Sequence, residues 1–255
     1  MNAFVLKIIA LVSMILDHMG VVFPLTFGFE FRILGRLAFP IYAFLIAEGF
    51  AYTKNPVKFL VRLFVFAIIS EPFFDLAMQQ SGLMILYAPG INFFADTNIF
   101  YTLFLGGSVI VVSQWAEKYL QKTVEVSSLI LHVIIIILPL YAFMWLAEVA
   151  LTSDYGAFGV LFIFTMYFTR QFKLKAIRLA VMVMLCIWQH SWILGQVRHS
   201  GFASFADISW MLLPAMLMAV VLVAFYNGRR GPGLKWFFYI SYPVHLAVLV
   251  FFANF

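Results

Sequence analysis

The sequence predicts an all-α fold: a polytopic integral membrane helical bundle of about nine transmembrane helices with a cytoplasmic N-terminus. Of its 255 residues, 65% are hydrophobic and only 11% are charged, whereas soluble domains carry about 25% charged residues. Its apolar runs approach the length of about 20 residues that a helix needs to cross a bilayer. They are too long for the strands of an outer-membrane barrel.

Nine apolar runs are the predicted spans, and we expect them to form a single domain over residues 1–255. In chain order they cover residues 4–24, 35–53, 57–77, 98–115, 127–150, 156–170, 178–197, 208–226 and 236–254. The longest connection, residues 78–97, is expected either to lie along the membrane surface or to dip back into the protein. The first run is interpreted as a retained helix, because Asp17 and His18 stand where a cleavable signal needs small residues.

With the N-terminus placed in the cytoplasm, most basic residues fall on the cytoplasmic side of the membrane. Only Arg32, Arg36 and Arg198 then fall in outer segments, and all other lysines and arginines fall in cytoplasmic segments. This asymmetry follows the positive-inside rule. It explains the formal net charge of +5 as membrane orientation rather than nucleic-acid binding. We therefore expect a multi-pass protein of the cytoplasmic (inner) membrane, with the lipid bilayer as a partner and no nucleic acid.

Ionisable residues inside these apolar runs predict a polar chamber within the bundle. An ionisable group in a transmembrane helix costs several kcal/mol unless it faces a partner or a wet cavity. Lys7 and His18 share the first run, and at about 100° per residue they return to nearly the same face, about 16 Å apart along the axis. Asp17 points about 100° away from His18. Further polar residues lie in or beside the other runs: Arg32, Arg36, Glu48, Glu71, Asp75, Asn98, Asp154, Tyr155, His190 and His245.

Structural roles compete with a functional site for several of these residues. Lys7 can extend its ammonium to the inner interface. Arg36 can form an ion pair with Glu71 or Asp75 that holds helices together. His190 is typical of a hydrogen-bonding residue between helices. No metal site is predicted, since the sequence has no zincin pattern, and it also lacks a Walker loop and a nucleophile elbow.

Six segments, in order from the first span to the ninth, carry a family resemblance. They read LKIIALVSMILDHMG, GRLAFPIYAFLIAEGF, SEPFFDLA, NIFYTLFLGG, DYGAFGVL and FYISYPVHLAVL. Together they resemble the TraX family, which is named for the conjugation protein that N-acetylates F-type pilin. More distantly, the chain is similar to the acyltransferase-3 superfamily of membrane acyltransferases, whose first helix carries an arginine, ten residues and an essential histidine. Lys7 and His18 occupy that pattern here, with lysine in place of arginine.

The resemblance implies an enzyme that transfers an acyl group, acetyl from acetyl-CoA, to an acceptor at the membrane. The acceptor can be a protein N-terminus such as that of pilin, a glycan or a lipid. Acetyl-CoA would be the donor co-substrate, and no permanently bound cofactor is expected. The competing prediction is a proton-coupled transporter of small solutes that uses the same polar chamber. A catalytically inactive membrane scaffold is a third interpretation.

Acyl transfer needs a general base for the acceptor and hydrogen-bond donors for the developing oxyanion. We expect His18 to be the base, because a neutral imidazole can take a proton near pH 7. A carboxylate, Asp17, Glu48 or Glu71, is expected to orient the imidazole. The predicted oxyanion donors are Arg36, Asn98 or Tyr155.

Lys7 lies toward the cytoplasm on the predicted topology, where it would meet a phosphate of CoA. The predicted catalytic residues are therefore His18, Asp17, Arg36 and Glu48. The predicted binding residues for substrate or CoA are Lys7, Arg32, Glu71, Asn98, Tyr155 and His245.

Overall fold

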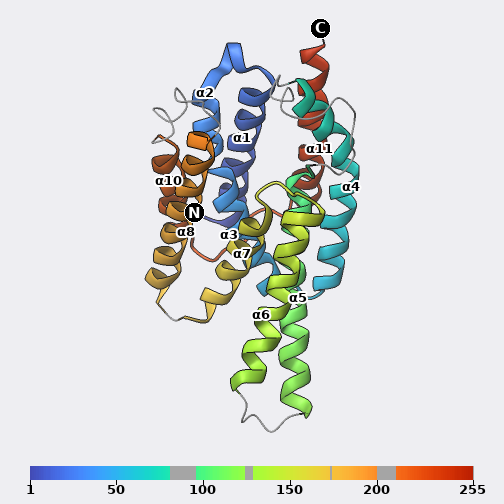
Figure 1. Ribbon diagram of the computed structural model, residues 1–255, viewed down its shortest axis with the longest axis vertical. Coiled ribbons are helices and arrows are strands. Elements are labelled where there is room, and N and C mark those ends of the chain that lie inside the picture. The colour runs from blue at the N-terminus through green and yellow to red at the C-terminus, as the bar shows by residue number, and fades with distance from the viewer. Residues whose placement is uncertain (81–95, 124–128, 173, 200–210, 255) are drawn as a thin grey trace. The chain divides into compact units, whose positions relative to one another are not determined.

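The computed structural model describes residues 1–80, 96–123, 129–172, 174–199 and 211–254, and in these residues the chain forms helices and no strand (Figure 1). The elements are α1 (Ala3–Val22), α2 (Pro24–Gly35), α3 (Ala38–Tyr52), α4 (Pro56–Gln80), α5 (Ile99–Thr123), α6 (Leu129–Trp145), the π-helix η2 (Leu146–Ala150), α7 (Gly156–Phe168), the 3₁₀-helix η3 (Thr169–Gln171), α8 (Lys175–His199), α10 (Leu212–Ala224) and α11 (Lys235–Ala253). The predicted all-α class is confirmed.

Six helical stretches within the described residues are long and apolar enough to cross a membrane. They are Ala3–Val22, Glu30–Tyr52, Ile99–Tyr119, Val133–Ala150, Lys175–Leu194 and Lys235–Ala253. The other three predicted spans fall on α4, α7 and α10. Helix α6 exposes large apolar side chains such as Ile137 and Leu138, a surface that suits lipid better than water. The prediction of a polytopic helical membrane bundle is confirmed, with nine as an approximate number of spans.

Helix α2 is an element that the sequence did not predict. Pro24 begins it, at a helix position where the missing N–H leaves no hydrogen bond unmade. Gly28, with φ at +51°, interrupts the helix inside its bounds. The chain then resumes helical geometry and returns Arg32 and Arg36 to the side of α1. Most of the connection predicted over 78–97 lies outside the described residues.

Packing contacts divide the chain into two compact units. Unit 1 comprises Met1–Leu45, Phe73–Ile91 and Thr169–Phe255, and unit 2 comprises Ile46–Pro72 and Asn92–Phe168. The first two boundaries along the chain fall inside helices. One lies after Leu45 in α3, and the other lies after Pro72 in α4.

In unit 1, α1 packs against α2 and α11, and α8 packs against α10. Helices α1 and α11 run parallel, since Phe4 meets Phe238 near their starts and His18 meets His245 further along (Figure 1). Backbone hydrogen bonds fix this arrangement, because Ala3 N donates to Arg229 O at 2.8 Å just before α11. A parallel pair agrees with an odd number of membrane crossings from the first helix to the last.

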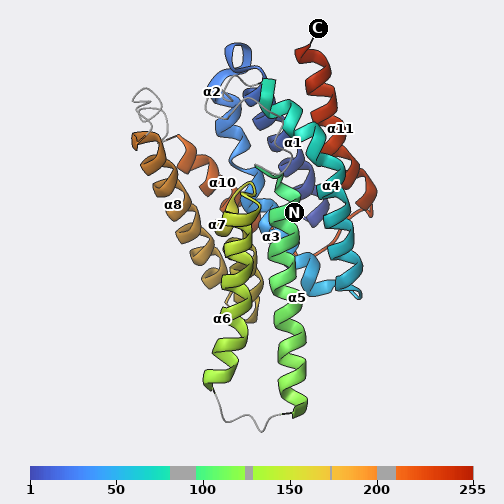
Figure 2. The same cartoon turned by 45° about the vertical axis from the view of Figure 1, so that its right-hand side comes forward.

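In unit 2, α5 packs against α6 and α7. Helices α5 and α6 lie side by side and run in opposite directions in both views (Figures 1 and 2). The core of this unit contains buried polar side chains near the start of α5, including Glu71, Asn98 and Thr102. Two of the predicted site residues therefore belong to a polar cluster of unit 2.

Candidate functional site

Two buried histidines from opposite ends of the sequence meet in unit 1. Nδ1 of His18 on α1 lies 2.6 Å from Nε2 of His245 on α11. The ring planes differ by 10°, and the ring centres are 4.9 Å apart. His18 is 6% exposed and His245 is 8% exposed. The pair is therefore shielded by protein, as an intramembrane polar contact needs to be.

The other ring nitrogens of the pair have different surroundings. Nδ1 of His245 lies 2.8 Å from the backbone oxygen of Ser241, one helical turn earlier in α11. Nε2 of His18 makes no hydrogen bond with any residue that the structure describes. Tyr242 packs its ring edgewise against both imidazoles, with ring centres 5.9 Å from His18 and 5.4 Å from His245. One ring nitrogen of the pair thus has no hydrogen-bond partner among the described residues.

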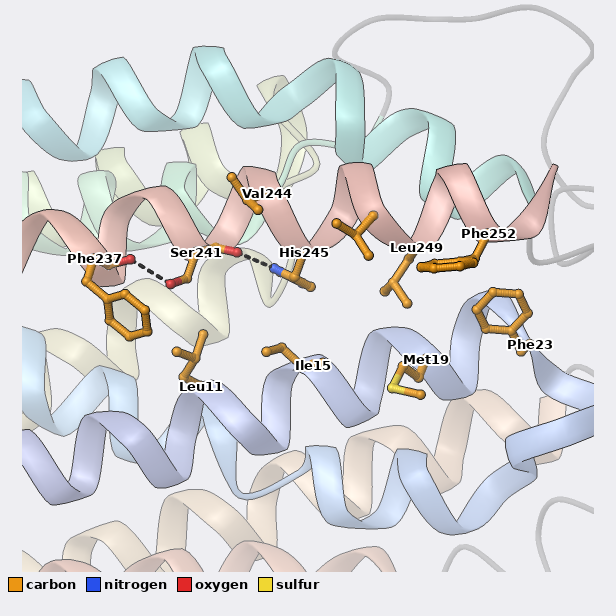
Figure 3. Close-up of a pocket in the computed structure, with 11 residues that line it drawn as sticks. Leu11, Ile15, Met19, Phe23, Phe237, Ser241, Val244, His245, Leu249 and Phe252 are labelled. Carbon is orange, nitrogen blue, oxygen red and sulfur yellow. Dashed lines mark hydrogen bonds between the residues drawn. The ribbon is translucent and has the colours of Figure 1, made fainter. Parts of the chain in front are cut away.

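His245 also lines an apolar groove of about 650 Å³ between α1 and α11 (Figure 3). One wall consists of side chains spaced four residues apart, of which Leu11, Ile15 and Met19 lie on α1 and Phe23 directly follows it. The other wall is α11, where Ser241 and His245 are the two polar residues. The polar atoms of both are already engaged, since Ser241 Oγ donates to Phe237 O at 2.6 Å, and the ring nitrogens of His245 contact Ser241 O and His18. The groove therefore presents an almost entirely apolar surface beside the histidine pair.

Asp17, next to His18 in sequence, belongs to a different cluster. Its carboxylate accepts hydrogen bonds from Arg32 Nη1 at 2.7 Å and from Arg36 Nη2 at 3.3 Å. Gly35 lets the carboxylate lie against the backbone, because a Cβ at that position would collide with Asp17. The two ion pairs hold the chain after Gly28 onto α1. The structure therefore pairs Asp17 with arginines, and the imidazole of His18, which was expected to meet a carboxylate, contacts His245 instead.

Lys7 and His18 face the same neighbour, as their spacing predicts. Lys7 Nζ lies 5.4 Å from the ring centre of Phe238 on α11, the helix that also carries His245. Lys7 is near the start of α1, and His18 is 11 residues further along the same face. The structure thus places a cation and an imidazole along one α1/α11 interface.

Glu71 and Asn98 meet in unit 2, and the sequence predicted both to bind substrate or CoA. Glu71 Oε2 accepts from Asn98 Nδ2 at 2.5 Å and from Asn98 N at 3.1 Å. Asn98 also donates to Ala67 O at 2.8 Å and caps α5 by accepting from Phe100 N at 3.0 Å. A carboxylate at a helix N-terminus is favoured by the helix dipole. These contacts join α4 to the start of α5.

Tyr155 and Glu48 are the remaining predicted residues, and both lie in unit 2. Tyr155 has φ at +65°, in the turn between η2 and α7. The preceding residue closes that turn onto α5, because Asp154 N donates to Thr97 O at 2.8 Å and Asp154 O accepts from Thr102 Oγ1. Glu48 is buried in α3. Both residues thus belong to the packing of unit 2, whereas the histidine pair belongs to unit 1.

Ser241 and Tyr242 contact the histidine pair, and the sequence predicted neither of them as a site residue. The signal for Ser241 is its spacing of four residues before His245, which places its carbonyl below the ring on a helix. Tyr242 gives no comparable signal, because tyrosines are frequent in apolar helices near membranes. Its position became evident only from the packing of α11 on α1.

Comparison with known proteins gives matches over nearly the whole chain. A family model described as TraX protein matches residues 3–253. A protein of Dichelobacter nodosus named "Probable fimbrial assembly protein FimC, serogroup H1" is 29% identical over 260 residues, which cover 97% of this chain and 94% of that protein. No solved structure matches the chain.

Proposed function

The chain belongs to the TraX family, and on this premise we propose that it is a membrane acyltransferase that transfers acetyl from acetyl-CoA to an acceptor at the cytoplasmic membrane. We take the acceptor to be the N-terminal amine of a filament subunit. The support is the name of the Dichelobacter nodosus relative, "Probable fimbrial assembly protein", together with the pilin N-acetylation for which the TraX family is named.

The observation that carries the proposal is the buried His18, one ring nitrogen of which is engaged by His245 while Nε2 makes no hydrogen bond within the described residues. An amine that attacks a thioester must lose a proton as the new C–N bond forms. Nε2 of His18 takes that proton as general base. The tetrahedral intermediate then breaks its C–S bond, and the leaving CoA thiolate takes the same proton from the imidazolium. The step yields an amide and free CoA, and the base is regenerated.

Lys7 is proposed to pair with a phosphate of CoA. Its ammonium lies at the start of α1, on the α11 side that His18 also faces. A lysine acts toward phosphate as a point charge without the fixed fork of arginine. This position would let the pantetheine arm run along the α1/α11 interface toward His18.

The ion-pair cluster of Asp17, Arg32 and Arg36 has a supporting role in this proposal. Its guanidinium groups bind a carboxylate on α1, so they fix the end of α2 beside the helix that carries the base. Within unit 2, Glu71 and Asn98 bind one another and stabilise the start of α5.

The proposal is tested by transfer of labelled acetyl from acetyl-CoA in proteoliposomes that contain the purified protein and a co-reconstituted pilin subunit. Intact-mass spectrometry of the subunit reports the acetyl increment, and peptide fragmentation locates it. We expect the wild-type protein to acetylate the N-terminal residue. We expect His18→Ala to keep its elution profile in size-exclusion chromatography and to lose acetyl transfer by a factor of about 10² or more.

The matched control is His190→Ala. His190 lies on α8 in unit 1 and is also buried, with 8% of the residue exposed. This variant should transfer acetyl at the wild-type rate. Unchanged transfer by His18→Ala would remove the base assignment. Solute flux through the liposomes without any requirement for acetyl-CoA, and without acetylation, would favour a transporter instead.

A further inference from the structure

The contacts of the two histidines indicate which nitrogen of each ring carries the hydrogen. A backbone carbonyl only accepts hydrogen bonds, so Nδ1 of His245, 2.8 Å from Ser241 O, carries hydrogen. A neutral imidazole has one N–H, so Nε2 of His245 is then an acceptor. The hydrogen in the 2.6 Å contact therefore belongs to Nδ1 of His18. Nε2 of His18 keeps its lone pair.

The other arrangements of hydrogen are unfavourable at these distances. If Nε2 of His245 donated to His18, the bare Nδ1 of His245 would face the carbonyl oxygen of Ser241 with lone pair against lone pair. If either ring carried both hydrogens, its positive charge would be buried, since His18 is 6% and His245 is 8% exposed and the groove beside them has apolar walls. An uncompensated buried charge is strongly disfavoured. One arrangement remains, in which both rings are neutral and the hydrogens point from His18 to His245 and from His245 to Ser241.

The ring geometry fits a directed N–H···N hydrogen bond. The distance between ring centres, 4.9 Å, exceeds the nitrogen–nitrogen distance of 2.6 Å by about two ring radii. The two nitrogens therefore lie on the line that joins the ring centres, and the rings meet edge to edge. Hydrogen bonds are strongest when donor, hydrogen and acceptor are close to linear, and the 10° angle between the rings preserves this alignment.

We propose that His245 is a positioning residue for His18: it holds His18 in the tautomer with hydrogen on Nδ1, turns Nε2 toward the acceptor, and stabilises the imidazolium that forms. This inference rests on the proposed role of His18 as general base and deepens it. When His18 takes a proton on Nε2, its bond to His245 becomes charge-assisted and stronger. The same role is filled by a carboxylate in serine hydrolases, whereas here the partner is a second imidazole oriented by the Ser241 carbonyl.

The direct test is nuclear magnetic resonance of the full-length protein labelled with ¹⁵N-histidine in bilayers, in which only five histidines contribute signals. His18→Gln identifies the resonances of His18 by their loss. We expect His18 to show protonated Nδ1 and unprotonated Nε2, and we expect a scalar coupling across the hydrogen bond to Nε2 of His245. The spectrum tests the assigned hydrogens, and the effect on kcat of the variants below tests whether His245 acts on the reaction through His18.

Two variants of similar size separate hydrogen bonding from packing. His245→Gln keeps an acceptor oxygen near the position of Nε2, so His18 should keep its tautomer while the nitrogen–nitrogen coupling disappears. His245→Phe keeps the ring but no acceptor, so the Nδ1-protonated tautomer should no longer dominate. In acetyl transfer, His245→Phe should lower kcat by about 10- to 100-fold with little change in KM for acetyl-CoA, and His245→Gln should restore most of that loss.

Two results would overturn the inference: wild-type His18 with its hydrogen on Nε2, or a His245→Phe variant with unchanged tautomer and unchanged kcat. The second result leaves Nε2 of His18 free to be the base. The first result would also remove Nε2 as the atom that takes the proton, but it would leave acetyl transfer by the protein itself standing. Absence of acetyl transfer by the wild-type protein would instead overturn the proposed function, and the tautomer measurement does not depend on that activity.

Discussion

Replacement of Asn98 by alanine removes three hydrogen bonds of one fully buried side chain. Asn98 is 0% exposed, and its partner Glu71 is 3% exposed. The amide nitrogen donates to Glu71 Oε2 at 2.5 Å and to Ala67 O at 2.8 Å, and the amide oxygen accepts from Phe100 N at 3.0 Å. The variant therefore tests whether this part of unit 2 depends on the polar cluster for its stability.

The expected loss follows from these three bonds. Removal of an N-cap side chain costs about 1 kcal/mol. A hydrogen bond to a charged group contributes about 1.5–3 kcal/mol, and one to a neutral carbonyl contributes about 1 kcal/mol. Asn98→Ala should thus lower the free energy of unfolding by about 4 kcal/mol. This is a large fraction of the roughly 5–15 kcal/mol that stabilises a typical protein.

The assay is reversible unfolding by steric trapping in bicelles, which reports the free energy of unfolding in a lipid environment. The matched control is Asn55→Ala. Asn55 is an exposed cap of α4 whose oxygen accepts from Lys58 N at 2.9 Å, so its loss should cost only about 1 kcal/mol. If both variants lose the same stability, the bonds of Asn98 to Glu71 and Ala67 do not contribute as calculated, and the reasoning fails.

Two glycines provide further tests of packing. Gly35→Ala should lower the free energy of unfolding by about 2 kcal/mol, because its Cβ would collide with the Asp17 carboxylate. Gly233→Ala is the control, since a Cβ there meets nothing within 4 Å and should change stability by less than about 0.5 kcal/mol; equal losses in the two variants would contradict the assignment. Gly156→Ala should cost about 2–4 kcal/mol, because Gly156 has φ at +44° and its Cβ would collide with Glu148. A thermal unfolding midpoint equal to that of the wild-type protein would refute this last expectation.

The helices of the fold were predictable because membrane spans depend mainly on the length of an apolar run. Each predicted span falls on a helix of the structure. Helix α2 was not predictable in the same way, since Pro24 and Gly28 are signals for a turn. Proline is accepted at the first helical position, and the glycine interrupts the helix with a positive φ. Local signals indicated a break there, and the helical segment after it is held on α1 by the ion pairs of Arg32 and Arg36 with Asp17.

Part of the candidate site was predictable from helical periodicity. Helical periodicity places Lys7 and His18 on one face, and the structure has both facing α11. Periodicity does not identify the helix that packs on that face. The partner of His18 lies 227 residues away, and only the parallel course of α1 and α11 brings His245 to the same depth. A carboxylate was the natural expectation, because a carboxylate is the usual partner of a catalytic histidine.

A neutral partner suits a base inside a membrane better than a carboxylate does. An ionised group within the bilayer is disfavoured by several kcal/mol unless it is paired, and the structure pairs Asp17 with Arg32 and Arg36. With one hydrogen on Nδ1 of each ring, the histidine pair carries no fixed charge, so it can remain buried in the resting protein. In the proposed mechanism, charge arises only when His18 takes a proton from the acceptor, and the bond to His245 strengthens at that moment. Interactions that strengthen as the reaction proceeds are the ones that accelerate it. In the proposed mechanism, a two-histidine base thus places its stabilisation in the transition state, while the permanent charge of Asp17 on the same helix is held by its ion pairs with Arg32 and Arg36.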